Sequence, residues 1–240
     1  NPKVDAIFGL HAWPGKVGTV EYRSGPTMAA AERMRITVTG SQTHGAVPWK
    51  GVDPIAISSQ IISALQTIVA REVNITQVPA VVTIGSIHGG VRNNIIPEEV
   101  VMEGTIRTFN DEVRKDIHDS IRKKAEMIAS ASGATAKVEI FSDIAKVTFN
   151  EPSLTEKMLP SLERVYGTEN VKITPFITGA EDFPFFTDHA PGLYFFNGVA
   201  PDPSKAAPNH SPYFFADERN LKYGTKALTQ LAVDYLYLYK

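Results

Sequence analysis

The feature that most constrains the fold is an alternation of strand and helix patterns across residues 29–142, in the order β-α-β-β-α-β. Met34 to Thr39 alternates with a period of two, which is typical of a half-buried strand. Asp53 and Pro54 predict the start of a helix, with the aspartate as its cap and the proline at its first position. The other expected elements are a helix capped by Asp111 and ended by Gly133, and strands at residues 80–87, 100–109 and 136–141. This order is that of the ferredoxin-like split βαβ unit.

The sequences on either side of this unit have a different pattern. Val4 to Leu10 predicts a short buried strand that ends at His11, and Ser153 predicts the cap of a helix. We expect an α/β protein in which residues 1–28 and 143–240 form one α/β layer, interrupted by an α+β unit at residues 29–142. A domain rarely begins on a core strand, so we also expect further residues upstream.

Composition narrows the classes of partner and of metal ligand. The 240 residues contain 24 Lys and Arg against 26 Asp and Glu, which gives a net charge of −2 and no basic surface for nucleic acid. No apolar run approaches the roughly 20 residues of a membrane span. The chain has no cysteine, so any metal site must use His and carboxylates. We expect a cytoplasmic protein that binds neither nucleic acid nor a membrane.

Two histidines in the flanking layer are candidate metal ligands. His11 is expected at the carboxyl end of a strand, where open α/β sheets bind ligands, although a His bonded to the backbone would have the same pattern. His210 lies in the loop Asn209-His210-Ser211-Pro212, where a solvated side chain is the alternative. Two imidazoles suit Zn²⁺ or a similar ion, but catalytic zinc usually has three protein ligands. The pair therefore predicts an incomplete site.

Three further candidates lie in the inserted unit. His44 occurs in a turn-rich segment and is either a functional group at a closing cleft or an ordinary surface histidine. Asn94 belongs to a link rich in Gly and Asn, which suits a tight connection and also offers amides to a substrate carboxylate. Arg107 could bind such a carboxylate with two parallel hydrogen bonds.

The acidic pair Glu181-Asp182 follows Gly179 at an expected helix start. The helix macrodipole alone favours acids there, and this explanation competes with a catalytic role. His88, His118 and His189 have no other candidate groups around them, so they are predicted to be structural or solvated.

Six segments taken in order resemble a known family. They are Gly9-Leu10-His11, Thr43-His44-Gly45-Ala46-Val47-Pro48 with Gly51-Val52-Asp53-Pro54, Gly89-Gly90 through Asn94-Ile95-Ile96-Pro97, Gly104-Thr105-Ile106-Arg107-Thr108, Gly179-Ala180-Glu181-Asp182-Phe183 and Asn209-His210-Ser211-Pro212. This series resembles the aminoacylase, hippurate hydrolase and thermostable carboxypeptidase family of zinc metallopeptidases. It is also similar to plant auxin-conjugate hydrolases and N-acetyldiaminopimelate deacetylases. The resemblance covers essentially the whole chain.

The resemblance implies a zinc-exopeptidase α/β domain with an inserted ferredoxin-like lid through which two subunits form a homodimer. It implies a centre of two divalent metal ions, usually zinc and sometimes manganese, nickel or cobalt. Within that pattern, His11 and His210 match metal ligands. His44 matches a lid histidine that reaches the partner subunit's site and stabilises the tetrahedral oxyanion.

The substrate-binding residues are implied in the same way. Asn94 matches the lid asparagine that binds the carboxylate end of the substrate. Gly179 and Glu181 match the segment that lines the substrate pocket. Arg107 matches a lid arginine, which we assign to substrate binding with a less defined role.

The chain departs from the family pattern at its metal centre. The other ligands of the family, a Cys or Asp, a His and a Glu, and the glutamate that acts as general base lie upstream of the Gly-Leu-His segment and are absent here. We therefore expect the intact protein to hydrolyse the amide bond of N-acyl amino acids or of C-terminal peptide residues. This chain alone is expected to hold metal at most partially and to be inactive. The alternative is a non-catalytic dimerisation and substrate-binding module.

Overall fold

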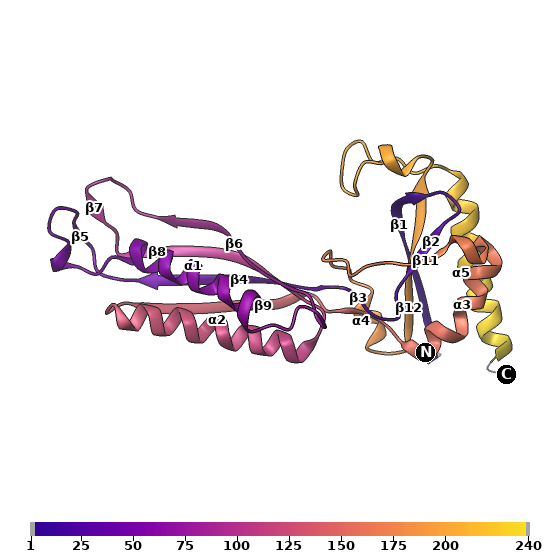
Figure 1. Cartoon of the computed structure of the whole chain (residues 1–240), viewed down its shortest axis with the longest axis horizontal. Coiled ribbons are helices and arrows are strands. Elements are labelled where there is room, and N and C mark those ends of the chain that lie inside the picture. Colours follow the sequence, from indigo (N-terminus) through magenta and orange to yellow (C-terminus); the bar gives the residue numbers. More distant parts are fainter. Residues whose placement is uncertain (1–2, 239–240) are drawn as a thin grey trace. The chain divides into compact units, whose positions relative to one another are not determined.

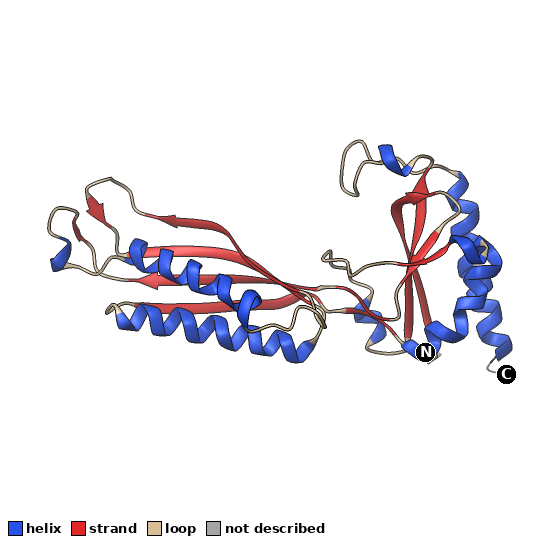
Figure 2. Cartoon of the chain, in the orientation of Figure 1, coloured by secondary structure: helices blue, strands red, loops and turns tan. Residues whose placement is uncertain are grey.

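The computed structural model describes residues 3–238 (Figures 1 and 2). Its strands are β1 (Ile7–Lys16), β2 (Val20–Tyr22), β3 (Gly25–Met28), β4 (Ala30–Thr39), β5 (Thr43–His44), β6 (Ala80–Gly89), β7 (Ile95–Ile96), β8 (Glu99–Thr108), β9 (Thr135–Ala145), β10 (Thr148–Asn150), β11 (Val171–Ile173) and β12 (Gly192–Ala200). Its helices are α1 (Pro54–Arg71), α2 (Asp111–Ala131), α3 (Pro152–Tyr166), α4 (Pro184–Thr187) and α5 (Arg219–Leu238), with short 3₁₀ turns η1 (Pro48–Lys50), η2 (Thr168–Asn170) and η3 (Pro203–Lys205). Among the described residues, no helix is both long and apolar enough to cross a bilayer.

Contacts divide the chain into two compact units. The first contains the chain up to Met28, Thr148–Ile177 and the chain from Glu181 onward. The second contains Ala29–Val147 together with Thr178–Ala180. We name them, after the parts that the resemblance implies for them, the catalytic unit and the lid unit, and describe each by itself.

The lid unit is an antiparallel sheet covered on one face by two helices (Figure 2). Its strand order is β6-β8-β4-β9. The first and the last of these strands in the sequence, β4 and β9, are therefore neighbours in the sheet, as in a ferredoxin-like unit. Alternate residues Met34, Ile36 and Val38 of β4 are fully buried and pack against α1 and α2. The period of two in the sequence thus selects the face that the helices cover, and the predicted fold class is confirmed.

The helix caps agree with the sequence in one case and differ in two. The Asp53 carboxylate accepts backbone hydrogen bonds from the first turn of α1, as predicted. In α2 the cap is Asn110, and Asp111 is already the first helical residue. In α3 the cap is Glu151, whereas Ser153 lies inside the first turn. Both differences are small because neighbouring polar side chains compete for the same unpaired backbone N–H groups.

The catalytic unit is built on a sheet of order β1-β12-β2-β11. All nine residues of β12 are buried, and α3 and α5 lie side by side over one face of the sheet (Figure 1). Leu193 and Phe195 point into the core beneath these helices. Tyr194 and Phe196 point to the opposite face, where they form a second apolar cluster. The candidate metal ligand on β1 lies on this second face.

Strand β1 is longer than the sequence pattern predicts, and this corrects the position of His11. Pairing with β12 continues from Ile7 through Trp13 and resumes at Lys16, so His11 lies opposite Phe196 within the strand instead of at its end. Pro14 lies in the irregularity between Trp13 and Lys16, where β1 has no registered partner in β12, so it removes no ladder hydrogen bond from this pair.

Candidate metal and substrate site

His11 is oriented with one ring nitrogen occupied and the other free. Its Nδ1 lies 2.7 Å from the carbonyl oxygen of Ala12, which can only accept, so Nδ1 carries the proton of the neutral ring. The lone pair of Nε2 is then available to a metal ion. A backbone carbonyl that fixes the tautomer in this way is the usual partner of a metal-binding histidine. About 30% of the His11 side chain is exposed, which leaves the ring accessible.

The Glu181 carboxylate lies beside this free nitrogen. Its Oε2 is 4.0 Å from Nε2 of His11, and 18% of the side chain is exposed. Oε1 accepts the backbone N–H of Asp182 at 2.8 Å, and Oε2 accepts the hydroxyl of Tyr194. The helix-start explanation for Glu181 and Asp182 is wrong, because α4 begins only at Pro184 and has no acid in its first turn.

The charge state of Glu181 follows from these contacts. Burial raises the pKa of its carboxyl group, but the hydrogen bonds from Tyr194 and Asp182 and the nearby His11 ring outweigh this, and the net pKa is lowered. Burial and the bond to Glu181 raise the pKa of Tyr194 far above its usual value. The pair is therefore a tyrosine hydroxyl and a carboxylate anion at neutral pH. No sequence pattern singled out Tyr194, which is one of several aromatic residues in an apolar strand.

A backbone oxygen connects His11 to the loop that carries His210. Asn209 donates its side-chain amide to the carbonyl oxygen of Ala12 at 2.9 Å, and this is the oxygen that also accepts Nδ1–H of His11. His210 is exposed and has a φ of 66°, the only positive φ of a non-glycine residue within residues 3–238. Such a backbone conformation is costly and tends to occur at functional positions.

The donors present fit part of a metal site. Within residues 3–238, no group of three or more His, Asp or Glu side chains is placed to hold an ion. One zinc ion binds nitrogen at about 2.0–2.1 Å and carboxylate oxygen at about 2.0–2.2 Å, so two donors to one ion lie within roughly 4.3 Å of each other. The 4.0 Å between Nε2 of His11 and Oε2 of Glu181 meets this limit. His11 and Glu181 therefore fit two positions of a metal site.

The lid unit brings His44 and Asn94 together. Strands β5 and β7 pair His44 with Ile95, and the N–H of Gly45 donates to the carbonyl oxygen of Asn94 at 2.8 Å. The N–H of Ala46 donates to Nδ1 of His44 at 3.0 Å, so the neutral ring carries its proton on Nε2. His44 and the backbone of Asn94 thus lie next to each other on paired segments of the lid unit.

The structure does not bring Arg107 to that end. Arg107 lies opposite Ala31 near the last residue of β8, whereas the first residue of β8, Glu99, is opposite Thr39. At about 3.3 Å per residue, the two ends of β8 are roughly 25–30 Å apart. The Arg107 guanidinium donates to Thr105 and to the carbonyl oxygen of Ile106 at 3.0 Å, and burial lowers its pKa.

Gly179 belongs to the lid unit by its contacts, and its carbonyl oxygen accepts the N–H of Ala29 at 3.1 Å. Glu181, two residues later, belongs to the catalytic unit. The segment expected to line the substrate pocket therefore crosses from one unit to the other between these residues.

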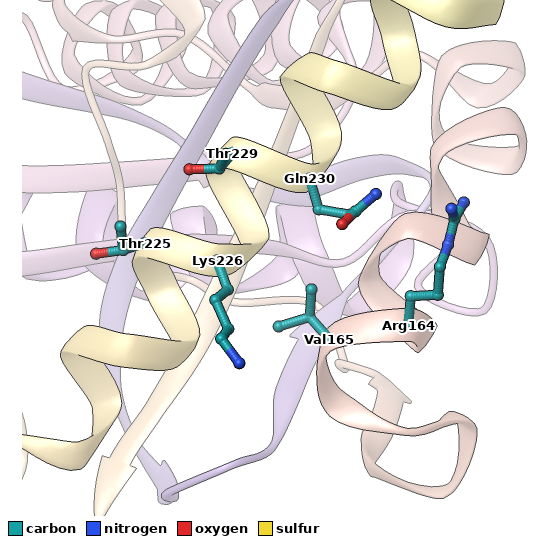
Figure 3. A pocket seen from close by; sticks show the side chains of 6 residues that line it. All are labelled: Arg164, Val165, Thr225, Lys226, Thr229 and Gln230. Atoms are coloured by element: carbon teal, nitrogen blue, oxygen red, sulfur yellow. The ribbon is translucent and has the colours of Figure 1, made fainter.

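A hollow on the helical side of the catalytic unit is separate from these groups (Figure 3). It lies between α3 and α5, has a volume of about 360 Å³, and is lined by Arg164, Val165, Thr225, Lys226, Thr229 and Gln230. It contains neither His nor acid, and Arg164 is already paired with Asp234 at 3.0 Å. The hollow therefore has no donors for a catalytic metal.

Comparison with known proteins agrees with the resemblance seen in the sequence. Residues 31–132 match the M20 peptidase dimerisation domain. The chain is 38% identical over 239 residues to thermostable carboxypeptidase 2 of Saccharolobus solfataricus, a match that covers 97% of this chain and 58% of the relative. It is 38% identical over 216 residues to the N-acetyl-L-cysteine deacetylase of Bacillus subtilis, which covers 90% of this chain and 50% of that protein.

The solved structures give the same result. A dinuclear metal-binding peptidase of the M20 family from Bacillus subtilis superposes with a TM-score of 0.75 at 29% identity, over 98% of this chain and 58% of that one. The chain thus spans between half and three-fifths of the length of the relatives that it matches. From its sequence, its fold and its dimerisation domain, the chain belongs to the M20 family of peptidases and amidohydrolases.

Proposed function

We propose that the intact protein is a metal-dependent hydrolase of amide bonds in N-acyl amino acids or at the C-terminal residue of peptides. The observation that carries this proposal is the tautomer of His11. Its Nδ1–H is bonded to a carbonyl oxygen, which leaves the lone pair of Nε2 available to a metal ion beside a carboxylate. Relatives named as a carboxypeptidase and a deacetylase, both of which cleave amide bonds, support it.

The proposal assigns each candidate residue a part in the reaction. His11 and His210 would each hold one of two divalent ions, of which zinc suits imidazole donors and Mn²⁺, Ni²⁺ or Co²⁺ are alternatives. A two-metal centre supplies an acidified water and an electrophile for the carbonyl group. Nε2–H of His44 donates to the oxyanion that forms when the carbonyl carbon is attacked.

Substrate binding is assigned to the remaining residues. The Asn94 amide binds the free carboxylate of the substrate at the His44 end of the lid, and Arg107 acts at the opposite end. Gly179 and Glu181 line the substrate pocket, with Glu181 on its metal side. We further propose that residues 29–142 form the lid and dimer surface of a homodimer, and that residues 1–28 and 143–240 belong to the catalytic domain. The match to the dimerisation domain supports the homodimer.

The first experiment compares two ligand variants in the intact protein. His11→Ala and His210→Ala are each expected to abolish turnover of an N-acetyl amino acid and to lower the bound metal measured by elemental analysis. His189→Ala is the matched control, because His189 is an exposed histidine of the same unit in the segment after α4. Full turnover and full metal content in either ligand variant would disprove the assignment.

A second candidate function concerns the 240-residue chain by itself. The lack of any group of three metal donors among the described residues favours a non-catalytic dimerisation and substrate-binding module with a weak metal site. This chain should show no hydrolysis of N-acetyl amino acids with added Zn²⁺ or Mn²⁺. Measurable turnover by this polypeptide alone would refute the module.

A further inference from the structure

We propose that Tyr194 is a positioning residue of the metal site, and that its hydroxyl holds the Glu181 carboxylate against the ion bound by His11. This inference rests on the proposed function, because it requires His11 to be a metal ligand. It gives Glu181 a role at the metal in addition to its place in the lining of the substrate pocket, and it gives a role to Tyr194, which no sequence pattern indicated.

Two acceptor atoms, Nε2 of His11 and Oε2 of Glu181, face each other. With the proton of neutral His11 on Nδ1, Nε2 offers only a lone pair, and Oε2 of the Glu181 carboxylate also offers only lone pairs. They lie 4.0 Å apart without a hydrogen between them. Two lone pairs at this spacing repel each other unless a positive charge lies between them, and a divalent ion supplies that charge.

Both carboxylate oxygens of Glu181 accept a hydrogen bond that holds them in place. The backbone N–H of Asp182 fixes Oε1 at 2.8 Å, and the hydroxyl of Tyr194 fixes Oε2. A glutamate that bound substrate by adapting to it would keep one oxygen free. Here the carboxylate has one orientation, with the remaining lone pair of Oε2 available on the side of His11.

Tyr194 itself is held by backbone hydrogen bonds and by ring packing. Its backbone N–H and carbonyl are both bonded to the buried side chain of Asn150, at 2.7 and 2.8 Å. Its ring packs on Phe183 at 4.8 Å and at a right angle to Phe196 at 5.7 Å between centroids. Only 5% of the residue is exposed. A rigidly held donor of this kind is what keeps a ligand or its neighbour in the productive geometry.

Gly9 shows how tightly this face of the sheet is assembled. A Cβ at Gly9 would lie 2.7 Å from the ring of Phe183 and 2.9 Å from that of Tyr194. Strand β1 therefore approaches the two rings as closely as a backbone without a side chain allows. His11, two residues further along β1, is placed on the same face by the same approach.

The test measures metal affinity in the intact protein with Co²⁺ and a competing chelator, alongside kcat and KM for an N-acetyl amino acid. Tyr194→Phe removes only the hydroxyl, and Glu181→Gln removes the charge. Tyr213→Phe is the matched control, since Tyr213 is an exposed tyrosine of the same unit whose hydroxyl forms no hydrogen bond within residues 3–238. Thermal unfolding checks that each variant is folded.

We expect both Tyr194→Phe and Glu181→Gln to lower Co²⁺ affinity by roughly 10-fold or more, the range for removing a residue that supports a metal ligand. The double variant should lose little more than Glu181→Gln, because the hydroxyl acts through the carboxylate. Tyr213→Phe should match wild type. Unchanged affinity with a raised KM in both single variants would overturn the inference and return Glu181 to the substrate. Unchanged affinity in His11→Ala would instead overturn the proposed function.

Discussion

Asn209 donates its side-chain amide to the carbonyl oxygen of Ala12 at 2.9 Å, across 197 positions of the sequence. Because this oxygen also accepts the ring N–H of His11, it links strand β1 to the loop that carries His210. The His11 ring and the residue before His210 therefore share one backbone acceptor, the carbonyl oxygen of Ala12.

Asn209→Ala should weaken metal binding far more than it weakens the fold. Loss of one hydrogen bond costs about 1 kcal/mol of unfolding free energy, whereas loss of support for a ligand loop costs roughly 10–100-fold in metal affinity. Chelator competition and urea unfolding measure the two quantities. Asn74→Ala is the control, because Asn74 bonds only within its own turn of the lid. Equal metal affinity in both variants would contradict the prediction.

His210→Gly should lower metal content while leaving the fold as stable or slightly more stable. The φ of 66° costs a side-chain-bearing residue about 1 kcal/mol, and glycine avoids this cost. Part of the gain is offset by the larger entropy of glycine in the unfolded chain. Metal analysis and thermal unfolding of the same sample test both halves. A marked fall in melting temperature would show that the His210 side chain supports the fold.

The lid contains a buried ion pair that predicts a pH dependence. Nε2 of His118 on α2 lies 2.6 Å from Oε2 of Glu32 on β4, and only 1% of the Glu32 side chain is exposed. Burial raises the pKa of Glu32, but the hydrogen bonds from His118 and Ser142 and the charges of His118 and Arg114 outweigh it, and the net pKa is lowered. His118, which the sequence left as structural or solvated, is structural.

The sign of the effect follows from this lowered pKa. Glu32 gives up its proton more readily in the folded state than in the unfolded chain, whose value is about 4.3, so its contribution is present above that pH and is lost as pH falls below it. Glu32→Gln should therefore make the unfolding free energy less dependent on pH between 5 and 3. Urea unfolding across this range tests it, with the exposed Asp119→Asn of α2 as control.

Removing His118 should lower the free energy of unfolding more than removing the charge of Glu32. His118→Ala leaves the Glu32 carboxylate buried without its partner, which typically costs about 3–5 kcal/mol. Urea unfolding at pH 7 measures the loss. A change below about 1 kcal/mol would mean that water or another group replaces the histidine.

His44→Ala in the intact protein should lower kcat by about 10²–10³-fold, the usual loss when one oxyanion donor is removed. Metal content and dimerisation should stay unchanged, because the His44 side chain accepts a hydrogen bond from Ala46 within its own turn and the backbone pairing of β5 with β7 does not need the imidazole. Steady-state kinetics, elemental analysis and gel filtration measure the three properties. A loss of metal together with activity would assign His44 to the metal centre instead.

The sequence predicted the lid well because local signals and global packing agree there. The cap at Asp53 is a contact within three residues, and the alternation in β4 marks the face that α1 and α2 cover. The catalytic unit was harder to predict. Trp13-Pro14-Gly15 has the composition of a loop, but the segment lies within β1, because pairing with β12 includes Trp13 and resumes at Lys16. Long-range pairing of this kind overrides local preference.

In the candidate site too, some residues could be predicted from the sequence and others depend on long-range packing. His11 and His210 could be proposed from the sequence because a chain without cysteine offers only His and carboxylates to a zinc ion. The contact between Glu181 and Tyr194 joins a loop to a buried strand and leaves no periodic signal. Its geometry is set by how β12 and β1 pack, which only the folded chain reveals.

The pairing of β3 with β10 has a consequence for the modular design of the protein. Met28 and Thr148 are partners in this two-stranded ladder, so the chain leaves the catalytic unit and re-enters it on adjacent strands. Cα atoms of such partners lie about 4.5–5.5 Å apart, a gap that a turn of two to four residues closes. The lid is therefore inserted in the manner of an exchangeable cassette. An inserted segment of different length that keeps the pairing of Met28 with Thr148 requires no change in the course of β1, β2, β11 or β12.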